Sequence, residues 1–134
     1  MQGLEIIREG DAIHAIILRR DFIGKDKYNF LTPPDFPLQL GANKYSAGEE
    51  IKKHYHPDKE TRIRTVQEFI IVSKGRLKVF FFNEALRCFR ETILETGDMI
   101  LLTRGGHGFE TLAETTLVEI KQGPYDGTKD KIIF

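Results

Sequence analysis

Residues 66 to 82, VQEFIIVSKGRLKVFFF, decide the fold of this chain. Two apolar runs, Val66 to Ser73 and Leu77 to Phe82, flank Lys74-Gly75, which is predicted as a tight turn. Both runs are rich in β-branched and aromatic residues and are therefore predicted as strands. Val79 to Phe82 are apolar on both faces of their strand, so one face should fill a core. The other face must also be covered, which favours a homodimer.

Short strands of the same kind recur along the chain, separated by turn residues. No window of about 11 residues or more keeps a helical period without a glycine or proline. About ten strands and no helix predict an all-β sandwich or barrel. The prolines of residues 31–37 predict an edge or crossing segment. The remaining strands are expected at residues 4–8, 12–19, 38–45, 51–56, 87–94, 99–103, 109–112 and 116–121, with 99–103 central because it is apolar on both faces.

Composition limits the classes of protein that this chain can belong to. Its 134 residues suit one domain, residues 1–134, and Lys+Arg equals Asp+Glu at 20 each. This balance gives no electrostatic case for binding nucleic acid or an anionic membrane surface. One cysteine, Cys88, excludes an intrachain disulfide and fits a reducing compartment. No signal peptide or membrane-spanning run is visible, so we expect a cytoplasmic protein.

Paired histidines supply the first candidate for chemistry. Of four histidines, His54 and His56 lie two residues apart in the predicted strand 51–56. Residues i and i+2 of a strand point to the same face, so two imidazoles would lie side by side. Imidazole is the commonest metal-ligating side chain. Glu68 opens an apolar strand, and antiparallel pairing of that strand with residues 51–56 would bring its carboxylate to the imidazoles.

The spacing of these residues resembles the first motif of the cupin superfamily. Gly48, five residues and His54-x-His56 match its opening half, and Glu68, six residues and Gly75 match its closing half. The motif lies within residues 48–75. Eleven residues separate His56 from Glu68, where the family has three or four, and the extra residues are interpreted as a lengthened hairpin loop.

A second stretch resembles the second cupin motif, within residues 97–108. Gly97, five residues and Thr103-x-Gly105 match, with threonine in place of the usual proline. His107 falls one residue earlier than is usual, and the asparagine of the motif is absent. The resemblance covers about residues 38–122 and implies a single cupin-type jelly-roll β-barrel.

The resemblance also implies a mononuclear metal site with the ligands His54, His56, Glu68 and His107. Glu60 stands at the family's usual spacing from His56, but Glu68 is favoured because it opens a strand and keeps the spacing to Gly75. Three imidazoles and one carboxylate suit one divalent transition metal, Fe, Mn, Ni, Zn or Cu. Four protein ligands leave two octahedral positions open for water, dioxygen or a bidentate substrate.

Three functions remain open. The first is a metal-dependent enzyme, tested first as an oxygenase, acting on a small polar molecule. The second is a sugar-nucleotide isomerase or epimerase linked to surface-polysaccharide synthesis, in which histidine and tyrosine serve as acid and base without metal. The third is a non-enzymatic module that binds a small ligand.

The other chemically notable side chains have simpler interpretations. His14 lies outside both motifs and is excluded from the site. Glu119 and Lys121 share one strand face, which is either solvated or lines a polar cavity near the metal. Arg104 is interpreted as a solvated arginine rather than an anion-binding one. Cys88 is expected to be a small buried hydrophobic residue.

Overall fold

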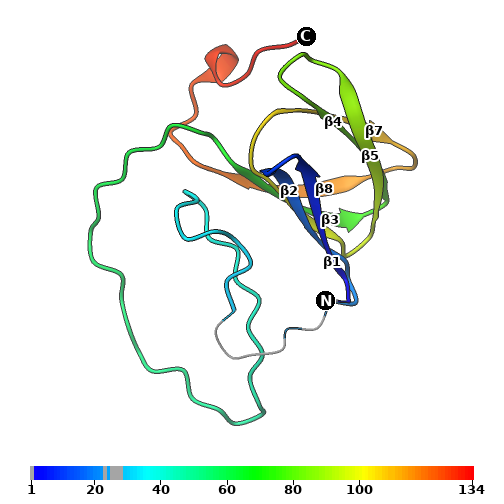
Figure 1. Cartoon of the computed structure of the whole chain (residues 1–134). Coiled ribbons are helices and arrows are strands. Elements are labelled where there is room, and N and C mark those ends of the chain that lie inside the picture. Colours follow the sequence, from blue (N-terminus) through cyan, green and yellow to red (C-terminus); the bar gives the residue numbers. More distant parts are fainter. Residues whose placement is uncertain (1, 23, 25–28) are drawn as a thin grey trace.

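Eight strands form two antiparallel sheets in the computed structural model, which describes residues 2–22, 24 and 29–134 (Figure 1). The five-stranded sheet has the order β1-β2-β6-β3-β8, and the three-stranded sheet has the order β5-β4-β7. The all-β prediction is confirmed. The strands are β1 (Leu4–Glu9), β2 (Ala12–Leu18), β3 (Glu68–Lys74), β4 (Arg76–Phe82), β5 (Cys88–Glu95), β6 (Met99–Leu102), β7 (Gly106–Thr111) and β8 (Thr116–Lys121).

The core lies between the two sheets and follows the alternation of each strand. Leu77, Val79 and Phe81 of β4 are buried, whereas the side chains between them are only half-buried. Ile70 and Val72 meet them from β3. The other core residues are Ile7, Ala15, Ile17, Leu94, Ile100 and Leu102. Burial of alternate residues from facing strands is what a two-layer β structure requires.

The predicted turn at Lys74-Gly75 forms, and it joins the two sheets. Gly75 has a φ of 98°, a conformation that side chains other than glycine rarely adopt. A Cβ at this position would lie 2.6 Å from Thr115 Oγ1. Thr115 can therefore approach the turn only because glycine has no side chain. Strand β6 lies between β2 and β3, which confirms that residues 99–103 are central.

The outer face of β4, which motivated the homodimer, is partly covered by this chain. Lys78 Nζ lies 5.0 Å from the ring centroid of Phe80. The ring of Phe134 meets that of Phe82 edge to face, with centroids 5.1 Å apart. The need for a partner subunit is therefore smaller than the sequence indicates.

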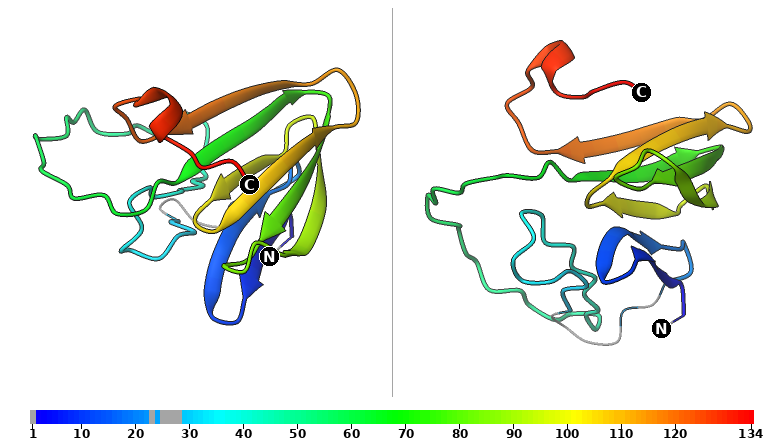
Figure 2. Two further views of the ribbon diagram at one scale, coloured as in Figure 1. Left: turned by 90° about the horizontal axis from the view of Figure 1, so that it is seen from above. Right: turned by 45° about the horizontal axis from the view of Figure 1, so that its top comes forward.

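Two predicted strands do not form. Residues 38–45 and 51–56 are irregular, and a single isolated bridge joins Phe30 to Gly41. Residues 46–66 run as a wide arc away from the sheets (Figures 1 and 2). In IKKHYH, residues 51–56, neither alternate face is apolar, so strand formation there would bury little hydrophobic surface.

A short 3₁₀ helix, η1 (Gly127–Lys129), follows β8. No other helix occurs in the described ranges, as the lack of helical periodicity predicts. None of the described residues belongs to a helix with the length and apolar character needed to cross a bilayer. The prediction for Cys88 is wrong: it begins an edge strand and is exposed.

Candidate functional site

Glu68 and His107 meet between the two sheets. Glu68 is the first residue of β3 and shares its inner face with Ile70 and Val72. His107 on β7 lies opposite the buried Phe81 of β4 and so also faces inward. Glu68 Oε2 lies 3.3 Å from His107 Nε2, and their side chains are 18% and 31% exposed. Two of the four predicted ligands, from opposite sheets, are therefore in contact.

Strand β8 adds two further charged groups to this pair. Lys121 lies opposite Glu68 in the β3–β8 register, and Glu119 lies opposite Ile70, so both share the inner face. Lys121 Nζ lies 3.9 Å from Glu119 Oε1 and 3.7 Å from Asp130 Oδ2. Glu119 is nevertheless 46% exposed and Lys121 32%, so the two side chains approach Glu68 from the surface of the molecule.

The two carboxyl groups of this cluster have shifted pKa values. The hydrogen bond with His107 lowers the pKa of Glu68 to about 2, despite the opposing effect of its burial. The hydrogen bond with Glu68 raises the pKa of Glu119, and burial adds to this effect. Glu68 is thus held as a carboxylate, and Glu119 takes up a proton at a higher pH than Glu68 does. An ionised inward-facing carboxylate beside an imidazole can bind a cation or orient a proton-transferring ring.

His54 and His56 lie apart from this pair, in the exposed arc. Their ring centroids are 5.3 Å apart, and His54 Nδ1 lies 2.8 Å from the carbonyl oxygen of Lys52. The predicted pairing of their segment with the strand of Glu68 is wrong, because β3 pairs with β6 and β8. Glu60 is exposed in the same arc. Among the described residues, no group of three or more His, Cys, Asp or Glu side chains is arranged to hold a metal.

The glycines that define the predicted motifs occupy backbone positions that favour glycine. Gly48, Gly75, Gly97 and Gly105 have φ values of 78°, 98°, 90° and 74°. Gly48 lies in a turn closed by a hydrogen bond from the Glu49 amide to the Ser46 carbonyl, at 3.2 Å. The turns of both motifs are therefore present even though the strand between Gly48 and His56 is not.

Sequence reasoning gave no role to His14, which the structure buries. His14, excluded because it lies outside the motifs, is only 4% exposed and contacts Phe89 at a centroid distance of 4.8 Å. Its position as a single polar residue in the apolar run 12–18 was the available signal. The role of Glu119 was obscured because Val118 and Ile120 indicate the buried face, whereas both are exposed, at 47% and 55%.

Comparison with known proteins assigns nothing further. No protein-family profile, curated protein or solved structure matches the chain. The candidate site therefore rests on two observations: Glu68 and His107 converge from opposite sheets, and β8 supplies Glu119 and Lys121 beside them.

Proposed function

We propose that this chain is a cupin-type jelly-roll barrel that binds one divalent transition metal through His54, His56, Glu68 and His107. The contact between Glu68 and His107 carries the proposal, because these ligands come from sequence-distant strands of different sheets. The low pKa of Glu68 supports it further, since a metal ligand must be deprotonated at neutral pH.

The remaining two ligands would arrive by strand addition. In the described residues β7 pairs only with β4, so its other edge offers free backbone donors and acceptors. Residues 51–56, paired along this edge, could place His54 and His56 on the inner face beside His107. The same reasoning puts residues 38–45 at the free edge of β8, which pairs only with β3 in the described part of the chain. Metal binding would supply the free energy that the weakly apolar segment lacks.

A metal held in this way would leave positions for a small polar ligand. With four protein ligands, two octahedral positions stay open, so the metal could polarise a bound oxygen atom or exchange electrons. Glu119 and Lys121 present a carboxyl and an ammonium group next to Glu68, which suits a substrate with hydroxyl or carboxylate groups. Oxygenase chemistry is the first activity to test.

Metal content and hydrogen exchange test this proposal together. Wild type reconstituted with Fe²⁺, Mn²⁺, Ni²⁺, Zn²⁺ or Cu²⁺ should bind about one equivalent of at least one of these ions and gain amide protection in residues 51–56. His54→Ala and Glu68→Gln should lower metal affinity at least about tenfold, since loss of even a group that only supports a ligand costs roughly that much. Glu60→Gln is the matched control in the same arc and should bind normally. Loss of metal in Glu60→Gln but not in Glu68→Gln would refute the ligand assignment.

The Glu68–His107 contact also favours one metal-free alternative. A carboxylate that orients an imidazole is an arrangement used for proton transfer, as required of a sugar-nucleotide isomerase or epimerase. If anaerobic reconstitution gives no bound metal and no protection of residues 51–56, this alternative replaces the first. A third possibility, a non-enzymatic ligand-binding module, would show ligand binding without turnover.

Assembly and location are part of the same proposal. Val118 and Ile120 are exposed on the outer face of the edge strand β8, and a homodimer could bury them there. Light scattering of the purified protein tests this, with Val118→Lys expected to give monomers.

An unpaired, exposed Cys88 is compatible with a reducing compartment, so we propose a cytoplasmic protein.

A further inference from the structure

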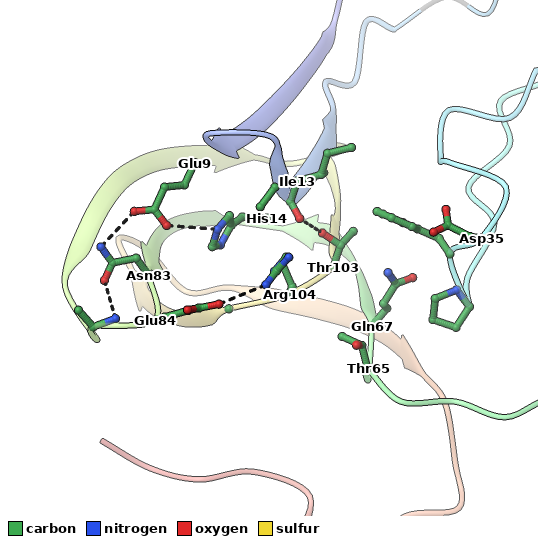
Figure 3. A pocket seen from close by; sticks show the side chains of 15 residues that line it. Glu9, Ile13, His14, Asp35, Thr65, Gln67, Asn83, Glu84, Thr103 and Arg104 are labelled. Atoms are coloured by element: carbon green, nitrogen blue, oxygen red, sulfur yellow. Dashed lines mark hydrogen bonds and ion pairs between the residues drawn. The ribbon is translucent and has the colours of Figure 1, made fainter.

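A polar cavity of about 930 Å³ opens beside His14, between the β1–β2 hairpin, the β4–β5 turn and the β6–β7 loop (Figure 3). Glu68 and His107 do not line it. We infer that this cavity binds a small organic compound through a primary ammonium group held by Glu9 and His14. This inference does not depend on the proposed metal site.

A β-bulge directs His14 toward the cavity. In the β1–β2 register Ile7 pairs with Ala15, whereas Arg8 pairs with Ile13, so His14 is the extra residue. Bulges of this kind redirect a side chain and often occur next to functional sites. Thr103 fixes the bulge twice: its amide donates to the His14 carbonyl at 2.9 Å, and its hydroxyl donates to the Ile13 carbonyl at 2.6 Å.

The imidazole of His14 is buried without a hydrogen bond. Its Nδ1 is fully buried beside Gly105, and no described group hydrogen-bonds to it. Burial lowers the pKa of His14, so the ring is neutral at pH 7. A buried polar atom without a partner costs stability, so its presence calls for an explanation. In the neutral tautomer with the proton on Nδ1, the other ring nitrogen, Nε2, is an acceptor on the side of Glu9 and the cavity.

Glu9 is held in place opposite that nitrogen. Asn83 donates a hydrogen bond to Glu9 Oε1 at 3.1 Å, and the Asn83 side-chain oxygen accepts from the amides of Ala85 and Arg87 at 3.1 Å each. Glu9 Oε2 lies 3.7 Å from His14 Nε2, which is too long for a hydrogen bond. One ammonium nitrogen could lie within hydrogen-bonding distance of both atoms and bridge them.

The charge of the lining favours a cationic group. Glu9, Asp35 and Glu84 line the cavity, with Arg104 as the only basic side chain among the described lining residues apart from the neutral His14. Arg104 Nη2 already lies 3.4 Å from Glu84 Oε1, so Glu9 has no full counter-charge. An anion alone would meet net repulsion, whereas an ammonium group would be attracted.

The opposite wall can hold a second polar group of the ligand. Gln67 is 2% exposed, and its side-chain oxygen accepts from the Leu38 amide at 3.1 Å. Its amide nitrogen faces the cavity and has no described partner (Figure 3). Together with Arg104 it could bind a carboxylate. The ligand is therefore either a free amino acid or a simple amine, both of which contain the required ammonium group. Ile13 and Phe36 offer apolar contact.

Calorimetric titration with three leucine derivatives tests the inference. Leucinamide carries the ammonium group alone, leucine carries ammonium and carboxylate, and N-acetylleucine carries the carboxylate alone. Leucinamide should bind, and N-acetylleucine should bind at least about tenfold more weakly. Tighter binding of leucine than of leucinamide identifies an amino-acid ligand, and the reverse order identifies an amine. Absence of leucinamide binding, or equal binding of N-acetylleucine, overturns the inference.

Variants separate binding from folding. Glu9→Gln should weaken leucinamide binding at least about tenfold, because a hydrogen bond to a charged partner is lost. His14→Leu should weaken it similarly while raising the melting temperature, since the unpartnered Nδ1 is removed. Glu114→Gln, a matched change at an exposed surface pair with Lys74, should have no effect. Unchanged binding in Glu9→Gln would refute the site even if His14→Leu fails to fold.

Discussion

Replacing Glu68 by glutamine should destabilise the metal-free protein in a pH-dependent way. In the folded chain the contact with His107 lowers the pKa of Glu68 from its usual value to about 2. A shift of roughly 2.5 pKa units corresponds to about 3–4 kcal/mol at most. The pair is partly exposed, and Glu119 gains a raised pKa in return, so we expect a net loss of about 1–2 kcal/mol at pH 7.

The sign of the pH dependence follows from the lowered pKa. Glu68 contributes stability above its unfolded-state pKa, and this contribution is lost as the pH falls toward about 2. The difference between wild type and Glu68→Gln should therefore be full at pH 6–7 and shrink between about pH 4.5 and 2. Glu119 acts in the opposite direction, since its raised pKa favours the protonated form. Glu119→Gln, which can donate to Glu68 at every pH, should therefore be more stable than wild type at pH 7.

Urea unfolding in the presence of EDTA measures these differences at a series of pH values. Chelation is needed because a bound metal would add its own stabilisation. A difference between wild type and Glu68→Gln that stays constant from pH 7 to pH 3 would refute the reasoning. So would the absence of any difference at pH 7, because the contact with His107 would then contribute nothing.

Three further changes test the fold. Gly75→Ala should lower the free energy of unfolding by about 2–3 kcal/mol, because the new Cβ would meet Thr115. Gly10→Ala, where the new Cβ has open space around it, should lower it by about 1 kcal/mol. Urea unfolding compares the two variants. Asp98→Asn should cost about 2–3 kcal/mol, since this 3% exposed carboxylate accepts two backbone amides and an arginine; equal melting temperatures would contradict this. Phe81→Ala should cost about 3–5 kcal/mol by thermal unfolding, and a loss below 1 kcal/mol would mean that the core is elsewhere.

Local pattern was sufficient where apolar alternation or a continuous apolar run marks the strand itself. The β1–β2 hairpin, the turn at Lys74-Gly75 and the central strand 99–103 follow from alternation and turn chemistry, and all three form, although β3 and β4 lie in different sheets. The segments 38–45 and 51–56 were predicted as strands from the same kind of pattern. In residues 51–56 neither alternate face is apolar, and pattern alone does not report whether pairing repays the cost of ordering a segment.

The same limit applies to the candidate site, because sequence spacing places together only the residues whose strands form. Glu68 and His107 meet because each belongs to a strand that does form. His54 and His56 share a motif but do not lie in a strand, so their distance from Glu68 could not follow from spacing alone. The sequence left the face of Glu119 open because Val118 and Ile120 indicate the buried face, whereas they lie on the outer face of an edge strand and are exposed.

The position of β6 between β2 and β3 has a consequence for the kinetics of folding. Ala15 pairs with Leu102, so the first hairpin finds its partner strand only across most of the chain. Pairings of such large sequence separation slow folding toward milliseconds or seconds. The hairpin itself can form within microseconds, and until β6 arrives its apolar side chains stay open to other chains. Refolding at low protein concentration should therefore give a higher yield than refolding at high concentration.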